Sequence, residues 1–299
     1  MKKILSIGPV FIIIAALLWS LDGLLRRSLY VLPPSVIVFW EHVLGAIILA
    51  PFVLKKWSEI KALSKKEWLA IIAVSLFSGA LGTIFYTAAL TQVNFIQFSV
   101  VVLLQQLQPI WAISAAAIFL KEKLTPSFLK WAVIAIVASY FVTFKDLSIN
   151  LSTGSGTVMA AILALGAGLM WGSSTALSKA VLNKVSFWMA TFLRFIFAPI
   201  FAFIIIVALG QAGSVTGISQ SQWVTLLLIT FSTGMVALLV YYYGLKKTPA
   251  RVTTICELVW PASAIFIDYF YFHKGLSVTQ IIGVLVLVTA IRKVTKFRK

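Results

Sequence analysis

Two short polar sequences lie within long apolar segments, and each places a polar residue four positions before a proline. They are Gln105-Gln106-Leu107-Gln108-Pro109 and Cys256-Glu257-Leu258-Val259-Trp260-Pro261. Because a proline inside a helix leaves the carbonyl one turn earlier without its hydrogen bond, each sequence offers an acceptor to a bound solute. We predict that Gln105, Gln108 and Glu257 bind a substrate. Glu257 could also exchange a proton as a cavity opens to either side.

Helical spacing extends each sequence into a polar stripe. One stripe comprises Glu257, Pro261, Ala264 and Asp268, and the other comprises Gln105, Gln108 and Ala112. We expect the two stripes to face each other across a central cavity. The alternative is that these side chains only join neighbouring helices by hydrogen bonds.

Aromatic residues lie near these stripes. Tyr86 and Trp260 are deep in apolar segments, and Tyr242 lies within the run Tyr241-Tyr242-Tyr243. With Trp19 and Trp171, they are predicted to line the substrate path. Tryptophans near segment ends are instead typical anchors at the membrane interface.

Ionisable residues form a second group. Asp22 and Arg26 are four residues apart and share a helix face. Glu41 and His42 follow the Pro33-Pro34 turn, and Glu41 lies about seven residues, or roughly 10 Å of helical rise, below it. Arg26 or Arg27 can therefore reach Glu41, which predicts either a structural ion-pair cluster or an outer gate. Arg194 is a further ionisable residue inside an apolar segment and joins the predicted gating group.

The sequence does not indicate an enzyme. It lacks His/Glu metal spacing, a Gly-rich phosphate loop, and a Ser or Cys nucleophile with a plausible base. The two histidines, His42 and His273, are expected at the outer ends of different helices, and the single cysteine, Cys256, lies in an apolar run. We therefore predict no catalytic residues, no metal and no cofactor.

The elements that must position these residues are transmembrane helices. Hydrophobic residues make up 61% of the 299 residues and charged residues 11%, a composition typical of a chain in lipid. Since a helix needs about 20 apolar residues to cross a bilayer, the sequence predicts an all-α polytopic membrane protein with ten spans. In chain order, spans 1 to 10 are predicted at 5–31, 34–54, 67–90, 95–120, 126–144, 156–182, 186–209, 221–245, 249–272 and 277–292.

The positive charges predict an orientation. With the N-terminus inside, twenty Lys and Arg residues fall in inner segments and four at outer ends, as the positive-inside rule requires. Both termini are thus expected in the cytoplasm and the protein in the inner membrane. The net charge of +17 comes from these short segments, so we predict contact with the lipid bilayer and no nucleic-acid partner.

An internal repeat divides the chain into 1–150 and 151–299. Trp19 and Trp171, Pro109 and Pro261, and Gln105 and Glu257 are each 152 residues apart, and Gly79 and Gly234 are 155 apart. Because each half has five spans, an odd number, the second half is inverted in the membrane. Inverted repeats are typical of secondary transporters with a midplane substrate site.

The chain resembles the EamA-type branch of the drug/metabolite transporter superfamily over essentially its whole length. The resemblance rests on Trp19, Trp171, Arg194 and the block from Pro109 to Lys121-Glu122-Lys123-Leu124-Thr125. His42 and Lys274 depart from the pattern, at positions where an arginine and an acidic residue are common. The resemblance implies ten helices around a central cavity, with spans 5 and 10 peripheral, and export of amino acids or related metabolites.

We therefore predict a secondary transporter that exports amino acids or related small metabolites by alternating access through a central cavity. Two alternatives stay open: a carrier of nucleotide sugars or lipid-linked substrates, and an intramembrane enzyme. The oligomeric state is also open, with a homodimer as one possible assembly.

Overall fold

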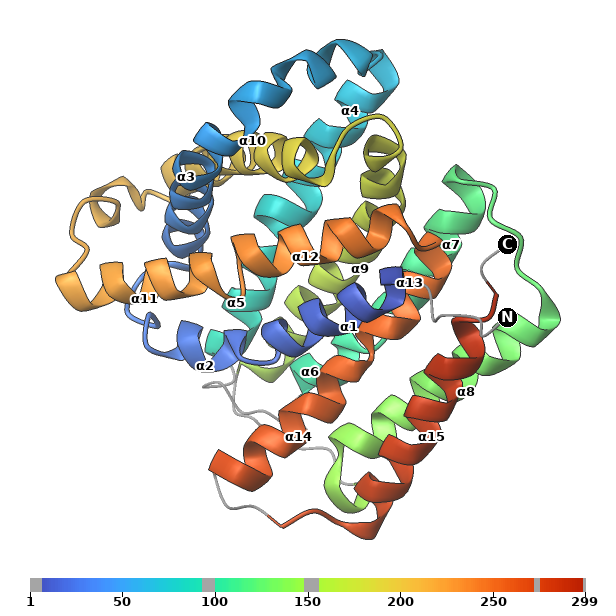
Figure 1. The fold of residues 1–299 in the computed structure, drawn as a ribbon. Coiled ribbons are helices and arrows are strands. Elements are labelled where there is room, and N and C mark those ends of the chain that lie inside the picture. Colours follow the sequence, from blue (N-terminus) through green and yellow to red (C-terminus); the bar gives the residue numbers. More distant parts are fainter. Residues whose placement is uncertain (1–6, 93–99, 148–155, 272–274, 298–299) are drawn as a thin grey trace.

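The computed structural model describes residues 7–92, 100–147, 156–271 and 275–297, and every regular element in these ranges is a helix (Figure 1). The first half holds α1 (Ile7–Trp19), α2 (Asp22–Arg27), α3 (Pro34–Val53), η1 (Leu54–Ala62), α4 (Lys65–Val74), η2 (Ser75–Leu81), α5 (Gly82–Gln92), α6 (Val100–Gln105), α7 (Gln108–Phe119), α8 (Pro126–Thr143) and η3 (Lys145–Leu147). The second half holds α9 (Thr157–Leu182), α10 (Phe187–Ala208), η4 (Ala212–Ser214), α11 (Gln220–Phe231), α12 (Met235–Lys246), α13 (Ala250–Glu257), α14 (Val259–Tyr271) and α15 (Val278–Val294).

The chain is a polytopic all-α membrane protein. Seven helical segments of the described residues are long and apolar enough to cross a membrane, and they correspond to predicted spans 1, 2, 3, 5, 6, 7 and 8. Spans 4 and 9 are divided near their prolines, and α15 has 17 residues. Each predicted span therefore has a helical counterpart, although residues 5–6 of span 1, 95–99 of span 4 and 272 of span 9 lie outside the described part.

Polar caps define where several helices begin. Thr125 accepts a hydrogen bond from the backbone N–H of Phe128 at the start of α8. Ser277 and Gln280 form a capping box at the start of α15. A capping side chain satisfies backbone N–H groups that have no partner in the first helical turn, so these two turns fix the start of the paired helices α8 and α15.

The first span of each half packs against the third span of the other half. Span 1 of the first half (α1) packs against span 8 (α12), and span 6 (α9) packs against span 3 (α5). Spans 2 and 7 (α3 and α10) pack together at the interface between the halves. Spans 5 and 10 (α8 and α15) pair with each other at the edge of the bundle (Figure 1), as the resemblance implied.

Four spans lose regular α-helical geometry at matching repeat positions. Span 3 contains the π-helical segment η2, and span 8 is broken between α11 and α12. Span 4 is broken between α6 and α7, and span 9 between α13 and α14. Irregular backbone at membrane depth occurs where it lines a cavity or is buried in protein, so these four breaks locate the candidate site.

The turn that follows α7 ties span 4 to span 9. The carboxylate of Glu122 accepts hydrogen bonds from the backbone N–H groups of Ala250 and Arg251, at 2.7 and 3.0 Å. It also pairs with the Arg251 guanidinium at 3.2 Å. Glu122 thus caps the N-terminus of α13 with a charge that the helix dipole favours, which gives the Lys-Glu-Lys block of the sequence a structural role.

Candidate functional site

A central cavity of about 210 Å³ lies between the two halves. All four irregular spans contribute to its wall, together with α1, α2, α3, α9 and α10. Its lining includes all thirteen site residues predicted from the sequence: Trp19, Asp22, Arg26, Glu41, His42, Tyr86, Gln105, Gln108, Trp171, Arg194, Tyr242, Glu257 and Trp260. The predicted residues therefore converge on one space.

Glu257 lines this cavity and links the two halves by hydrogen bonds. Its Oε2 accepts a hydrogen bond from the Gln108 amide at 3.0 Å, and its Oε1 accepts one from the Tyr241 hydroxyl at 2.8 Å. Gln108 is the first residue of α7 and Glu257 is the last residue of α13, so both stand at broken helix ends. The interaction joins the two predicted polar stripes by side chains.

Gln105 was expected to lie opposite Glu257, but its side chain contacts α9 instead. Its amide donates to the backbone carbonyl of Ala164 on α9 at 2.9 Å, and the side chain is buried. Gln108, one turn later, takes the place opposite Glu257. The helix break after Gln105 changes the direction of the following residues, and sequence spacing for a continuous helix could not include this change. Ala264 and Asp268 have side chains outside the described part.

Two aromatic pairs frame the cavity in matching positions. The Trp19 and Tyr241 ring centroids are 5.1 Å apart with an interplanar angle of 52°, and those of Trp171 and Tyr86 are 5.2 Å apart at the same angle. Each pair joins the first span of one half to the third span of the other. The two pairs thus place aromatic rings from both halves at the cavity, an arrangement that suits a planar ligand.

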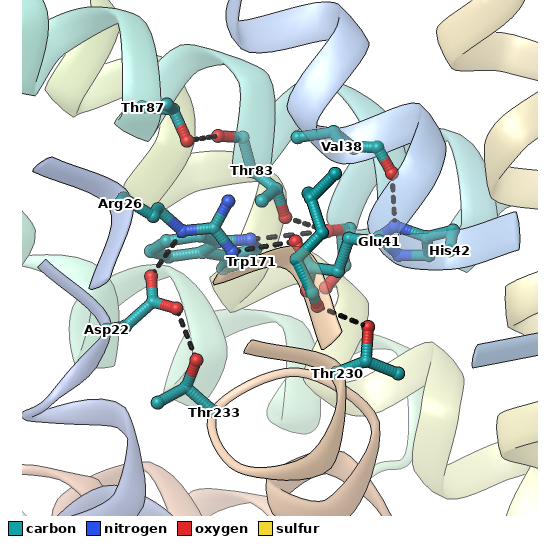
Figure 2. Close-up of polar contacts among 12 residues, drawn as sticks. Asp22, Arg26, Val38, Glu41, His42, Thr83, Thr87, Trp171, Thr230 and Thr233 are labelled. Atoms are coloured by element: carbon teal, nitrogen blue, oxygen red, sulfur yellow. Dashed lines mark hydrogen bonds and ion pairs between the residues drawn. The ribbon is translucent and has the colours of Figure 1, made fainter. Parts of the chain in front are cut away.

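An ion-pair network closes one part of the cavity wall (Figure 2). Arg26 pairs with Asp22 at 2.5 Å and with Glu41 at 2.7 Å. The Thr233 hydroxyl donates to Asp22 at 2.6 Å, so the network connects spans 1 and 2 to the break in span 8. The predicted contact between Arg26 and Glu41 is confirmed, whereas Arg27 is exposed.

Arg194 lies 152 residues after His42, its repeat counterpart, and contacts the irregular segment of span 3. Its Nη2 donates to the Ser78 carbonyl at 3.1 Å, and its Nη1 donates to the Tyr242 hydroxyl at 3.4 Å. The Trp171 indole N–H also donates to Ser78, at 3.3 Å. Ser78 lies in the π-helical segment η2, so the irregular backbone of span 3 supplies the carbonyl that holds both side chains.

Two glycines allow this close approach. A Cβ added to Gly234 would lie 2.8 Å from Glu41 Oε1. A Cβ added to Gly79 would lie 2.6 Å from the Cβ of Ala198 and 3.6 Å from Arg194 Nε. In each half, the glycine at the break of the third span thus permits contact with the second span of its neighbour.

His42 lies elsewhere than expected. The sequence places it at the outer end of a span, but it is buried in the middle of α3, with its ring 4.6 Å from that of Phe195. Its Nδ1 lies 2.9 Å from the Val38 carbonyl (Figure 2). The helix begins at Pro34, so His42 is more than two turns inside it. His273 lies outside the described residues, whose His, Cys, Asp and Glu side chains form no cluster of three suited to a metal.

Two lining residues that hold the site were not among the predicted site residues. Tyr241 donates to Glu257, and Thr233 donates to Asp22. Tyr241 lies 155 residues after Tyr86, and Thr233 lies 155 residues after Ser78. The repeat offset of the third spans was therefore the signal that could have identified both.

Lys179 does not contribute to this cavity wall. Its ammonium donates to the carbonyls of Leu245 and Lys246 at 2.8 and 2.9 Å, where it caps the C-terminal end of α12. It is a helix cap rather than a cation available to a substrate. Arg26 and Arg194 are the cationic groups among the described lining residues.

Comparison with known proteins gives a family match in each half of the chain. The model of the EamA-like transporter family matches residues 6–144 and again residues 158–295. The chain is 33% identical over 291 residues to the riboflavin transporter ImpX of Fusobacterium nucleatum subsp. nucleatum, covering 97% of each chain. It is 21% identical to an uncharacterized transporter of Clostridium kluyveri, covering 96% of this chain and 91% of the relative.

A solved crystal structure shares the fold. The TM-score is 0.74 at 15% sequence identity, and the match covers 99% of this chain and 98% of the other. At this identity the likeness concerns the fold alone.

Proposed function

The chain belongs to the EamA-like transporter family, and from this premise we propose that it is a secondary transporter for a planar, hydrogen-bonding metabolite of the flavin type. The observation that carries the proposal is the pair of matched aromatic contacts at a cavity that the hydrogen-bonded pair Gln108 and Glu257 also lines. Ligand sites of this kind combine aromatic walls with a few well-placed polar groups.

The relative from Fusobacterium nucleatum supports the choice of cargo. It is a riboflavin transporter and aligns with almost the whole chain. An isoalloxazine ring offers two flat faces to the Trp and Tyr rings and carries N–H and C=O groups along one edge. Flavin therefore replaces the amino acids expected from the sequence as the proposed cargo, and amino acids become competitors in its test.

The presence of two repeats supports a mechanism of alternating access. We propose that residues 1–150 and 151–299 are the two repeats and that they rock about the cavity, because inverted repeats offer two conformations of similar energy. The Asp22–Arg26–Glu41 network would close the cavity on one side. Arg194, the repeat counterpart of His42 in the second half, would close it on the other.

The charge distribution supports a location and an orientation. We propose that the protein lies in the inner membrane with both termini in the cytoplasm, because twenty of its twenty-five Lys and Arg residues then fall in inner segments. The direction of net transport would follow the substrate gradient in the absence of a coupled ion.

Counterflow in liposomes tests the proposed function. Purified protein reconstituted with internal unlabelled riboflavin should accumulate external labelled riboflavin, and liposomes without protein should not. Excess flavin should compete with this uptake, whereas amino acids should not. Saturable uptake of an amino acid without any uptake of riboflavin would overturn the flavin proposal and restore the earlier cargo.

A further inference from the structure

Gln108 and Glu257 present a hydrogen-bond donor and an acceptor side by side. The Gln108 Nε2 atom lies 3.0 Å from Glu257 Oε2. Nε2 carries two N–H groups, and Glu257 takes one of them. A carboxylate oxygen accepts more than one hydrogen bond, so Oε2 retains the capacity to accept from a ligand. Both side chains are partly buried and line the cavity.

The backbone fixes where these two groups stand. α7 begins at Gln108 immediately after the break in span 4, and α13 ends at Glu257 immediately before the break in span 9. Pro109 and Pro261 follow these breaks, and a proline prevents the regular hydrogen bond of its own residue. The two side chains are therefore held at facing helix ends, with their polar atoms directed toward each other across the boundary between the halves.

Tyr241 links this polar edge to the aromatic frame. Its hydroxyl donates to Glu257 Oε1 at 2.8 Å, which fixes the second carboxylate oxygen. Its ring packs against Trp19 at 5.1 Å. A ring that packs against these aromatic side chains would therefore lie near the carboxylate of Glu257, to which Tyr241 is bonded.

We propose that Gln108 and Glu257 form a two-point clasp for a cyclic cis-amide edge, in which an N–H and a C=O group are adjacent on a planar ring. The ring N–H donates to Glu257, and the ring carbonyl accepts from Gln108. Amide side chains recognise base edges by the same pairing of one donor with one acceptor. Flavins, pterins and uracil-type bases carry this edge, so the inference deepens the proposed function and rests on it for the choice of flavin.

The clasp also predicts selectivity. A site built to pair with a ligand N–H rejects an analogue that lacks it, because the buried acceptor then loses its partner. Methylation of the ring nitrogen removes the donor and adds bulk directly at Glu257. Methylation elsewhere on the ring system leaves the edge unchanged.

Binding to the full-length protein in lipid nanodiscs tests this proposal by quenching of flavin fluorescence. We expect wild-type protein to bind riboflavin at least about tenfold more tightly than N3-methylriboflavin. Glu257→Gln should weaken riboflavin binding by at least about tenfold and leave N3-methylriboflavin binding unchanged within about twofold. Gln108→Leu should weaken both ligands, because both retain the carbonyl.

Two matched controls separate the clasp from a general loss of structure. Glu67→Gln makes the same chemical change in an exposed capping box that glutamine can also form. Gln220→Leu makes the other change at an exposed position of α11. Both controls should bind riboflavin as the wild type does.

The results distinguish the clasp from the proposed cargo. Equal binding of riboflavin and N3-methylriboflavin to the wild type overturns the clasp while flavin transport stands. Binding of a pterin or uracil with the same N-methyl discrimination, without riboflavin binding, supports the clasp and overturns flavin as cargo. If no ligand of the three ring classes binds to the wild-type protein, the clasp is overturned together with the flavin proposal.

Discussion

The ring of Trp19 lies 5.1 Å from the ring of Tyr241, and the same contact is repeated between Trp171 and Tyr86 at 5.2 Å. Each tryptophan belongs to the first span of one half, and each tyrosine belongs to the third span of the other. The halves are therefore joined by two equivalent aromatic contacts, and all four rings line the cavity.

Loss of an aromatic face should weaken flavin binding. Replacing Trp171 by Leu removes one stacking surface and the indole N–H that contacts Ser78, whereas Trp171→Phe retains a ring. We expect Trp171→Leu to weaken riboflavin binding by about 1 kcal/mol more than Trp171→Phe does. Titration of flavin fluorescence measures the difference. Trp57→Leu, at an exposed position of η1, is the control, and equal losses in all three variants would contradict the stacking role.

The ion-pair network should depend on charge balance. Arg26→Gln leaves Asp22 and Glu41 as neighbouring buried carboxylates without their cation, which should cost about 3–5 kcal/mol of stability. Arg27→Gln, one residue along and exposed, should cost little. Thermal unfolding in detergent compares the two variants.

A triple variant separates stability from gating at the same network. Asp22→Asn and Glu41→Gln added to Arg26→Gln remove all three charges, so the stability should largely return. Transport should remain altered if the network gates the cavity. Wild-type counterflow by the triple variant would show that the charges serve stability alone.

Gly79 should be coupled to Ala198 through steric contact. A methyl group at Gly79 would lie 2.6 Å from the Cβ of Ala198, so Gly79→Ala should destabilise the protein by about 1–3 kcal/mol. Ala198→Gly should restore part of this loss in the double variant. A double-mutant cycle of thermal stability measures the coupling, and strictly additive effects would contradict the contact. Gly213→Ala is the control, because its Cβ would meet open space.

Glu122 should stabilise the start of α13. Glu122→Ala removes two backbone caps and the pairing with Arg251, and we expect a loss of about 2 kcal/mol. Glu122→Gln retains an acceptor and should lose less. The unfolding temperature distinguishes them. Glu67→Ala removes a capping residue at an exposed helix start, so a loss as large as that of Glu122→Ala would argue against the importance of burial.

Hydropathy and repeat offset predicted most of the fold. A helix that crosses a membrane must satisfy its backbone internally and present an apolar surface, so the ten spans are visible as apolar runs. The 152-residue offset between Trp19 and Trp171 indicated two repeats, and the family model matches the chain twice. The convergence of Asp22, Arg26 and Glu41 was also predictable, since short helical spacing and one tight turn bring them together.

The sequence by itself determined the helices, the repeat and the residue types that gather at the cavity, because these depend on local composition and periodicity. The tertiary structure decided which partner each polar side chain meets. Gln108 rather than Gln105 pairs with Glu257, because the break in span 4 changes the direction of the chain between them. Tyr241 and Thr233 join the site because the break in span 8 and the packing of α12 against α1 bring them there, and such contacts between distant spans are not encoded in the spacing of any single helix.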